Sequence, residues 1–228
     1  MSIEKKPAKN EIYFVWFNRY AGVTVKTPTK TLVIDPVDVK SRNFRNIDVV
    51  LITHEHYDHL DQPLVSEIQR ISRCMVIADS TSTRKLRNNI PPEKLTEVQP
   101  GSEVKLDKVL IRAERSNHPP AATPVSYTIT SDDGVRIFHT SDSLPYPEMI
   151  EAGDKVDLLF CTVGIAPGAS PETGFEIARL VEPKVAAPYH TSSVADQKKF
   201  AELLKKEMPR TTCLIPELGK IYQVSKKS

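Results

Sequence analysis

Residues 53–61 read Thr-His-Glu-His-Tyr-Asp-His-Leu-Asp, which places His54, His56, Asp58 and His59 within six positions of a chain that has only 6 histidines. The preceding residues, 48–53, form a short apolar run, DVVLIT, that predicts a strand buried on both faces. Loops that follow such strands are where α/β folds place their functional groups. Imidazole and carboxylate groups without thiolate suit zinc, iron or manganese. Because one turn cannot direct four such groups at a single tetrahedral ion, the segment predicts two neighbouring metal ions.

Three further candidate ligands, His118, Asp142 and His190, each come shortly after the end of a predicted strand. If these strand ends meet at one edge of the fold, that edge can collect all seven side chains. Any one of the three, taken alone, is better explained as a hydrogen-bonded residue of the core or surface. Together with the histidine-rich segment, they predict a site of five histidines and two aspartates for two ions.

The ordered pattern His54-x-His56-x-Asp58-His59, His118, Asp142 and His190 resembles the metallo-β-lactamase superfamily, over about residues 11–224. The resemblance implies an α/β fold, a four-layer αβ/βα sandwich with the metal site at one edge of its sheets. It also implies a division of the ligands: His54, His56 and His118 for one ion, Asp58, His59 and His190 for the other, and Asp142 as the bridge.

Within this superfamily, the chain is similar to the compact branch that contains ascorbate-6-phosphate lactonase and the N-acyl-phosphatidylethanolamine phospholipase D relatives. The segments that carry this similarity are 32–36 (LVIDP) and 164–191, which ends in Pro-Tyr-His-Thr. Two residues depart from the usual pattern of the branch. Tyr20 stands where the histidine of a Gly-His pair is expected after the first strand. Ser141 replaces the glycine that usually precedes the bridging aspartate.

Short strands alternate with helices along the chain, which predicts two sheets with helices on the outside. We expect one domain over residues 1–228, with tails at 1–10 and 225–228. The predicted strands are 11–17, 23–25, 31–34, 48–53, 74–78, 103–106, 109–114, 125–130, 135–139, 156–162, 184–187, 212–215 and 220–224. The predicted helices are 63–71, 80–88, 171–181 and about 194–207.

Composition and charge exclude several classes of protein. With 31 basic and 29 acidic residues, the net charge of +2 does not favour a nucleic-acid partner or an acidic membrane. No apolar run reaches the ~20 residues of a membrane span, and the Lys-rich N-terminus does not resemble a secretory signal. The 3 widely spaced cysteines predict buried thiols in a reducing cytoplasm. We expect a cytoplasmic enzyme with a small-molecule substrate, and assembly as a homo-oligomer stays open.

These observations predict a metal-dependent hydrolase that uses a dinuclear, metal-bridged hydroxide on a small ester, lactone or phosphoester. Asp58 is the predicted catalytic residue, which orients the nucleophile and relays a proton. Zinc is the preferred metal, with manganese or iron as alternatives. Two other functions stay open at this stage: a nuclease or phosphodiesterase that acts on nucleic acid, and a non-enzymatic scaffold that binds metal.

Four residues near the predicted site have two interpretations each. His139 shares the strand face of Val135, so it predicts a core residue or a partner of a ligand rather than a ligand. Asp35 either orients a ligand histidine or forms a turn. Tyr20 and Tyr57 either face the substrate or pack against the protein.

Overall fold

The computed structural model describes residues 2–149 and 156–226, which form two seven-stranded mixed sheets. The first sheet has the strand order β14 (Ile221–Ser225), β1 (Glu11–Trp16), β2 (Val23–Lys26), β3 (Thr31–Ile34), β4 (Val49–Ile52), β5 (Met75–Asp79) and β6 (Leu95–Val98). The second sheet has the order β13 (Thr212–Cys213), β12 (Val185–Tyr189), β11 (Leu158–Thr162), β10 (Arg136–His139), β9 (Val125–Thr130), β8 (Val109–Arg115) and β7 (Glu103–Leu106).

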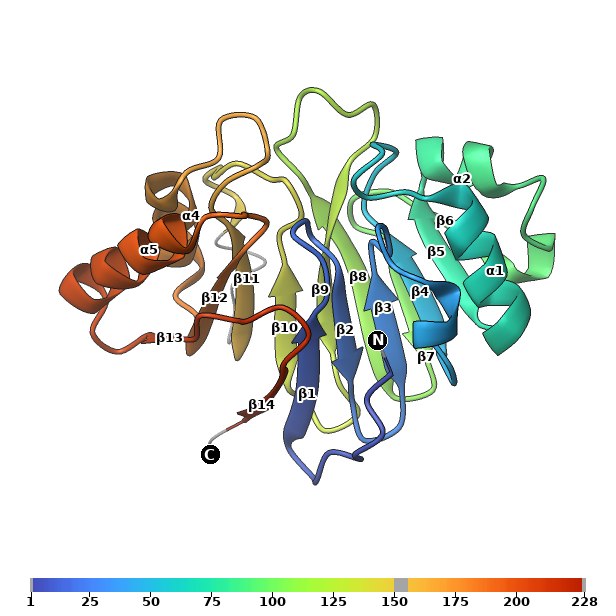
Figure 1. Cartoon of the computed structure of the whole chain (residues 1–228), viewed down its shortest axis with the longest axis horizontal. Helices are drawn as coiled ribbons and strands as arrows, with labels where there is room; N and C mark the ends of the chain where they lie inside the picture. Colours follow the sequence, from blue (N-terminus) through green and yellow to red (C-terminus); the bar gives the residue numbers. More distant parts are fainter. Residues whose placement is uncertain (1, 150–155, 227–228) are drawn as a thin grey trace.

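Helices cover the outer face of each sheet, so the molecule has four layers (Figure 1). The helices near the first sheet are α1 (Gln62–Ser72) and α2 (Ser80–Leu86), with the short 3₁₀ turns η1 (Ser41–Asn43) and η2 (Pro92–Lys94). The second sheet is covered by α4 (Pro171–Val181) and α5 (Val194–Glu207). This arrangement confirms the predicted αβ/βα sandwich.

Strand β4 shows why the sequence adopts this layering. Val49 and Leu51 point into the apolar core between the two sheets, whereas Val50 and Ile52 pack on the opposite face, in the core beneath α1 and α2. Alternate residues of a strand face opposite sides, so a strand in the middle of two apolar layers must be apolar at every position. The run that precedes the histidines is therefore a strand buried on both faces, as predicted.

The topology brings several strand ends to one edge of the molecule. Strands β3 to β6 are parallel to one another, as are β10 to β12. Strand β8 runs in the direction of β10, because both are antiparallel to β9. The loops after β4, β8, β10 and β12 therefore lie at the same edge, which is the upper edge in Figure 1.

A few elements differ from those expected from sequence. Strand β6 was not predicted, because it is a half-buried edge strand without a continuous apolar run. Residues 2–10 form no helix or strand, but Ile3 is buried against the first sheet and the Ser2 amide donates to the Asn43 carbonyl. At the other end, residues 225–226 are described, with Ser225 closing β14, and residues 227–228 lie outside the described part.

Within the described part of the chain, no helix combines the length and the apolar character that crossing a bilayer requires.

Candidate metal centre

All seven residues predicted as ligands lie together at this edge, and they fall into two groups. Within each group, one ligand atom of every residue lies within 4.8 Å of those of the others. The first group consists of His54, His56 and His118, and the second of Asp58, His59, Asp142 and His190. Because four different loops contribute, the sheets bring together side chains that are up to 136 positions apart in the chain (190 − 54).

The first group has the dimensions of a metal site. The His56 Nδ1 atom lies 3.1 Å from the His54 Nε2 atom and 3.3 Å from the His118 Nε2 atom. Metal–nitrogen bonds of about 2.0–2.1 Å in a tetrahedron separate neighbouring nitrogens by about 3.3 Å. The His54–His56 and His56–His118 nitrogen distances are therefore close to the spacing that one ion requires.

In the second group, the Asp142 carboxylate lies between the two sets of histidines. Its Oδ1 atom is 3.0 Å from the His59 Nε2 atom and 3.4 Å from the His190 Nδ1 atom. Its Oδ2 atom is 3.8 Å from the His118 Nε2 atom and 3.9 Å from the His54 Nε2 atom. Each carboxylate oxygen thus faces one of the two groups.

Among the described residues, three buried polar atoms of the second group have no partner in hydrogen-bond geometry: His59 Nε2, Asp142 Oδ1 and His190 Nε2. Buried polar atoms are normally paired, since an unpaired one costs free energy. These three atoms can instead be metal ligands. The donor set of imidazole and carboxylate is one that zinc, iron and manganese accept.

The charges in the cluster shift one another's protonation. Burial opposes ionisation of Asp142, but His59 and His190 outweigh it and hold the pKa of the Asp142 carboxyl well below its usual range. Burial also opposes protonation of His59, but Asp142 and Asp35 raise the pKa of His59 well above its usual value. Burial lowers the pKa of His190 to about 4 and the pKa of His54 well below its usual value. The neutral imidazoles of His54 and His190 are in the form that binds metal.

Asp35 contacts a candidate ligand rather than only forming a turn. Its Oδ2 atom lies 2.8 Å from the His59 Nδ1 atom, and both side chains are fully buried. This contact leaves His59 Nε2 facing Asp142. Asp35 also accepts hydrogen bonds from the Thr53 amide at 2.9 Å and the Thr53 hydroxyl at 2.7 Å. A carboxylate in this position fixes the tautomer and the orientation of the imidazole.

Thr53 and Ser141 complete this network. Thr53 was not predicted as part of the site, and Ser141 was noted only as the residue in place of a glycine before Asp142. The Thr53 hydroxyl lies 3.1 Å from the His54 Nδ1 atom, and the Ser141 hydroxyl donates to it at 2.8 Å. Ser141 has φ 54°, a left-handed conformation that favours glycine. The signal for Thr53 in the sequence is a hydroxyl-bearing residue directly after the apolar run 49–52.

His139 lies apart from both groups. It is fully buried, its Nε2 atom lies 2.9 Å from the Ala21 carbonyl oxygen, and its ring lies near those of Phe160 and Tyr189. The Nδ1 atom of His139 has no hydrogen-bond partner among the described residues. This placement agrees with the expected core position, and His139 belongs to neither potential metal-binding group.

The cluster is open to solvent only in part. His54, His59 and His190 are fully buried, His56 is half-buried, and Asp58 is 8% exposed. Tyr57, between the last two, is 82% exposed and packs against nothing in the core. Tyr20 is half-buried, and its ring centroid lies 6.1 Å from that of His190. His56 is therefore the most exposed of the seven clustered residues, followed by Asp58.

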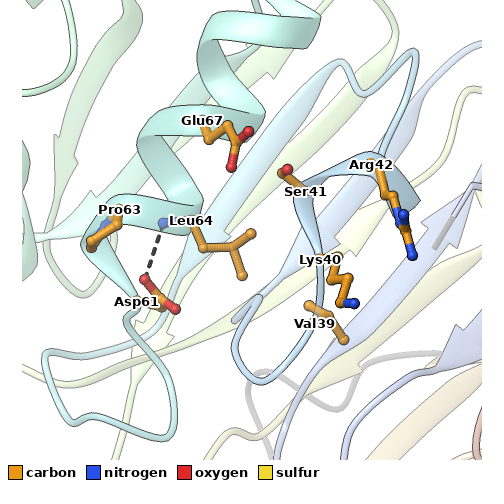
Figure 2. Close-up of a pocket in the computed structure, with 8 residues that line it drawn as sticks. All are labelled: Val39, Lys40, Ser41, Arg42, Asp61, Pro63, Leu64 and Glu67. Atoms are coloured by element: carbon orange, nitrogen blue, oxygen red, sulfur yellow. Dashed lines mark hydrogen bonds between the residues drawn. The ribbon is translucent and has the colours of Figure 1, made fainter.

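A separate cavity of about 560 Å³ lies between η1 and the start of α1, and Figure 2 shows its lining. One of its lining residues is Asp61, whose carboxylate accepts a hydrogen bond from the Leu64 amide at the N-terminus of α1. The lining residues are Val39, Lys40, Ser41, Arg42, Asp61, Pro63, Leu64 and Glu67. None of the seven clustered residues is among them, so this cavity lies beside the metal centre.

Two sheets sandwiched between helices, with a His/Asp cluster at one edge, define the class of metallo-β-lactamase-fold hydrolases. A family model described as beta-lactamase superfamily domain matches residues 21–215. The chain belongs to this superfamily, as a metal-dependent hydrolase.

Individual relatives agree with this assignment. A UPF0173 protein of Pyrococcus furiosus is 29% identical over 195 residues, which cover 84% of this chain and 90% of the relative. A UPF0173 metal-dependent hydrolase of Sulfurisphaera tokodaii is 25% identical, with 75% of this chain and 81% of the relative covered. The solved structure of Igni18, a metallo hydrolase from Ignicoccus hospitalis, matches with a TM-score of 0.81 at 19% identity, and the match covers 95% of this chain and 100% of that one. This last likeness concerns the fold.

Proposed function

We propose that the centre binds two divalent ions and hydrolyses a small ester, lactone or phosphoester. In this proposal the first group holds one ion, the second group holds the other, and Asp142 is shared. The observation that carries the proposal is the position of the Asp142 carboxylate, which directs one oxygen at each group. A shared carboxylate of this kind keeps two ions at reacting distance.

When bound, two such ions would lower the pKa of a water molecule and polarise the bond to be cleaved. Asp58 is suited to orient that water and accept its proton, because its carboxylate is both part of the cluster and partly exposed. The Asp58 Oδ2 atom lies 3.8 Å from the His59 Nε2 atom and 3.9 Å from the His190 Nε2 atom. We therefore assign Asp58 the catalytic role that the sequence predicted.

The surroundings of the cluster support a small substrate. Access is by way of His56 and Asp58, beside the exposed ring of Tyr57. An exposed aromatic ring at the opening can pack against an apolar part of a substrate. The nearly balanced charge of the chain, +2, gives little attraction for a nucleic acid.

Zinc is the metal that we propose, since five imidazoles and two carboxylates match its preference for nitrogen and oxygen ligands. Manganese and iron are alternatives with the same donor types. All three cysteines are free, two of them buried, which agrees with a reducing compartment. We propose a cytoplasmic location on that basis.

The test begins with metal content and continues with substrates. Protein reconstituted with zinc or manganese is expected to retain two ions per chain by elemental analysis. The loaded enzyme is then screened against chromogenic esters, lactones and phosphodiesters, with salt-dependent oligonucleotide binding measured in parallel. Retention of one ion or none would contradict the dinuclear centre. Turnover of oligonucleotides alone, with strongly salt-sensitive binding, would favour the nuclease.

A further inference from the structure

Glu55 lies between two candidate ligands, His54 and His56, but belongs to neither potential metal-binding group. Its Oε1 atom accepts a hydrogen bond from the Ala122 amide at 2.9 Å. Its Oε2 atom is buried and has no hydrogen-bond partner among the described residues. The Glu55 carboxylate therefore points across to another loop, away from the cluster histidines.

Ala122 belongs to the loop 116–124, which carries His118. Pro119 and Pro120 restrict the backbone between the two residues. The Ala121 amide also donates to the His118 carbonyl at 3.1 Å, which closes a turn. Because this short connection is stiff, fixing the position of Ala122 also limits where the His118 imidazole can lie.

The contact joins the two segments that supply the first group. His54 and His56 flank Glu55. Among the described residues, the other hydrogen bonds between residues 53–56 and 116–125 are the His56–His118 ring contact and the bond from the Val125 amide to the Thr53 carbonyl. A metal ion bound by the first group would be coordinated by the ring nitrogens of its histidines. The carboxylate of Glu55 is thus the side chain that joins the two loops without being a ligand.

We propose that Glu55 is a positioning residue, which holds the loop 116–124 so that the His118 Nε2 atom meets the other two nitrogens of the first group. This inference rests on the proposed function, since it requires an ion at that group. Asp35 has the corresponding place in the second group, where it contacts His59 directly. The two carboxylates would therefore act on different ions.

This difference makes the inference testable. In Glu55→Ala, Ala122 is exposed and its freed amide can bind water, so the fold should lose little stability. His118 should lose its alignment, and the affinity of the first group should fall about tenfold, the lower end of what partners of metal ligands contribute. The affinity of the second group should stay unchanged. In Glu55→Gln, the amide oxygen can still accept from Ala122, and the affinity should stay within about threefold of wild type.

The experiment is a Co²⁺ titration of the metal-free protein, followed by the visible absorption bands of the bound ion. His118→Ala supplies the spectrum of an ion in the second group, which assigns the bands. Glu93→Ala, on the exposed turn η2, is the matched control for loss of a carboxylate. Melting temperatures of the metal-free variants are measured as well, and a change below about 3 °C is expected for Glu55→Ala.

If Glu55→Ala lowers the Co²⁺ affinity of the first group alone, and Glu55→Gln restores it, the inference is supported. An equal loss of Co²⁺ affinity at both groups, with a large drop in melting temperature, would show a general structural role for Glu55 and overturn the inference. Unchanged binding of both ions in Glu55→Ala would overturn it too, while leaving the proposed function intact. If wild-type protein bound no Co²⁺, the proposed function would fail first, and this inference with it.

Discussion

The two groups of the candidate metal centre are built in different ways. In the second group, His59 and His190 are fully buried, and Asp35 contacts His59 from the end of β3. In the first group, His56 is half-buried, and His118 lies on the loop 116–124. Ligands of both groups lie on loops that follow strands, but a buried imidazole that a carboxylate fixes has less freedom than a half-buried one on the same loop. We therefore expect the second group to be the more rigid and the first to be more sensitive to changes in its loops.

Asp142→Ala should have the largest effect, because Asp142 is the residue that faces both groups. Affinity for metal should fall by at least about a hundredfold, and hydrolysis should be lost. The unfolding free energy should change much less, since the sheets supply most of the stability. Elemental analysis, turnover and urea denaturation of the variant measure the three quantities. Wild-type turnover in Asp142→Ala would rule out the shared role and, with it, the division into two groups.

His118→Ala and His139→Ala separate a candidate ligand from a buried core histidine. His118→Ala removes one of three histidines from the first group, so that ion should be lost while the second is retained. His139→Ala should keep both ions and cost about 1–3 kcal/mol of stability, through lost packing and the unpaired Ala21 carbonyl. Metal content and melting temperature of both variants are measured side by side. Loss of an ion in His139→Ala, with full retention in His118→Ala, would reverse the assignment.

Asp35→Asn tests the second group in the same way. The amide oxygen or nitrogen can still contact His59, but the charge that stabilises its orientation is gone. Affinity for the second ion should fall about ten- to a hundredfold, with the first ion unaffected. Stepwise Zn²⁺ titration of wild type and variant resolves the two ions. A loss of Zn²⁺ affinity at the first group alone would show that Asp35 acts on that group and not on the second.

Acidification should affect the second group more than the first. Asp142 and Asp35 raise the pKa of His59 above its ordinary value of 6.5, so the metal-free protein holds a proton there at neutral pH. A metal ion that binds the second group must displace that proton. The affinity of this group for metal should therefore rise with pH, by up to about tenfold per pH unit, until the pH exceeds the pKa of His59. His54 and His118, whose pKa values are lowered by burial, are neutral over this range.

Calorimetric Zn²⁺ titration in two buffers of different ionisation enthalpy counts the protons released on binding. Release of more proton with the second ion than with the first is the expected result. Release of a proton with the first ion only would contradict the assignment of His59.

Much of the fold was predictable from local sequence patterns. The apolar run before His54 and the alternation of strands and helices indicated two sheets with outer helices, and the structure has them. Strand β6 was missed because a half-buried edge strand needs no continuous apolar pattern. Element boundaries differ by one or two residues, since the ends of strands depend on their partners.

The partners of the candidate ligands were less predictable. Asp35 could be interpreted as a turn residue, because its contact with His59 joins positions that are 24 residues apart. Thr53 and Ser141 are 88 residues apart, and their hydrogen bond exists only because the two sheets face each other. The contact of Glu55 with Ala122 has the same cause, since it depends on two loops that follow different strands.

The sequence by itself determined the donor groups of the candidate centre, and these residue types and their short spacing limit which ions can be bound. His54, His56, Asp58 and His59 lie within one turn, so their proximity follows from chain connectivity alone. Only the tertiary structure decided which groups face each other. The direction of each Asp142 oxygen, and the carboxylate that supports each group of histidines, depend on how distant strands pack. A pattern of residues along the chain does not encode such directions locally.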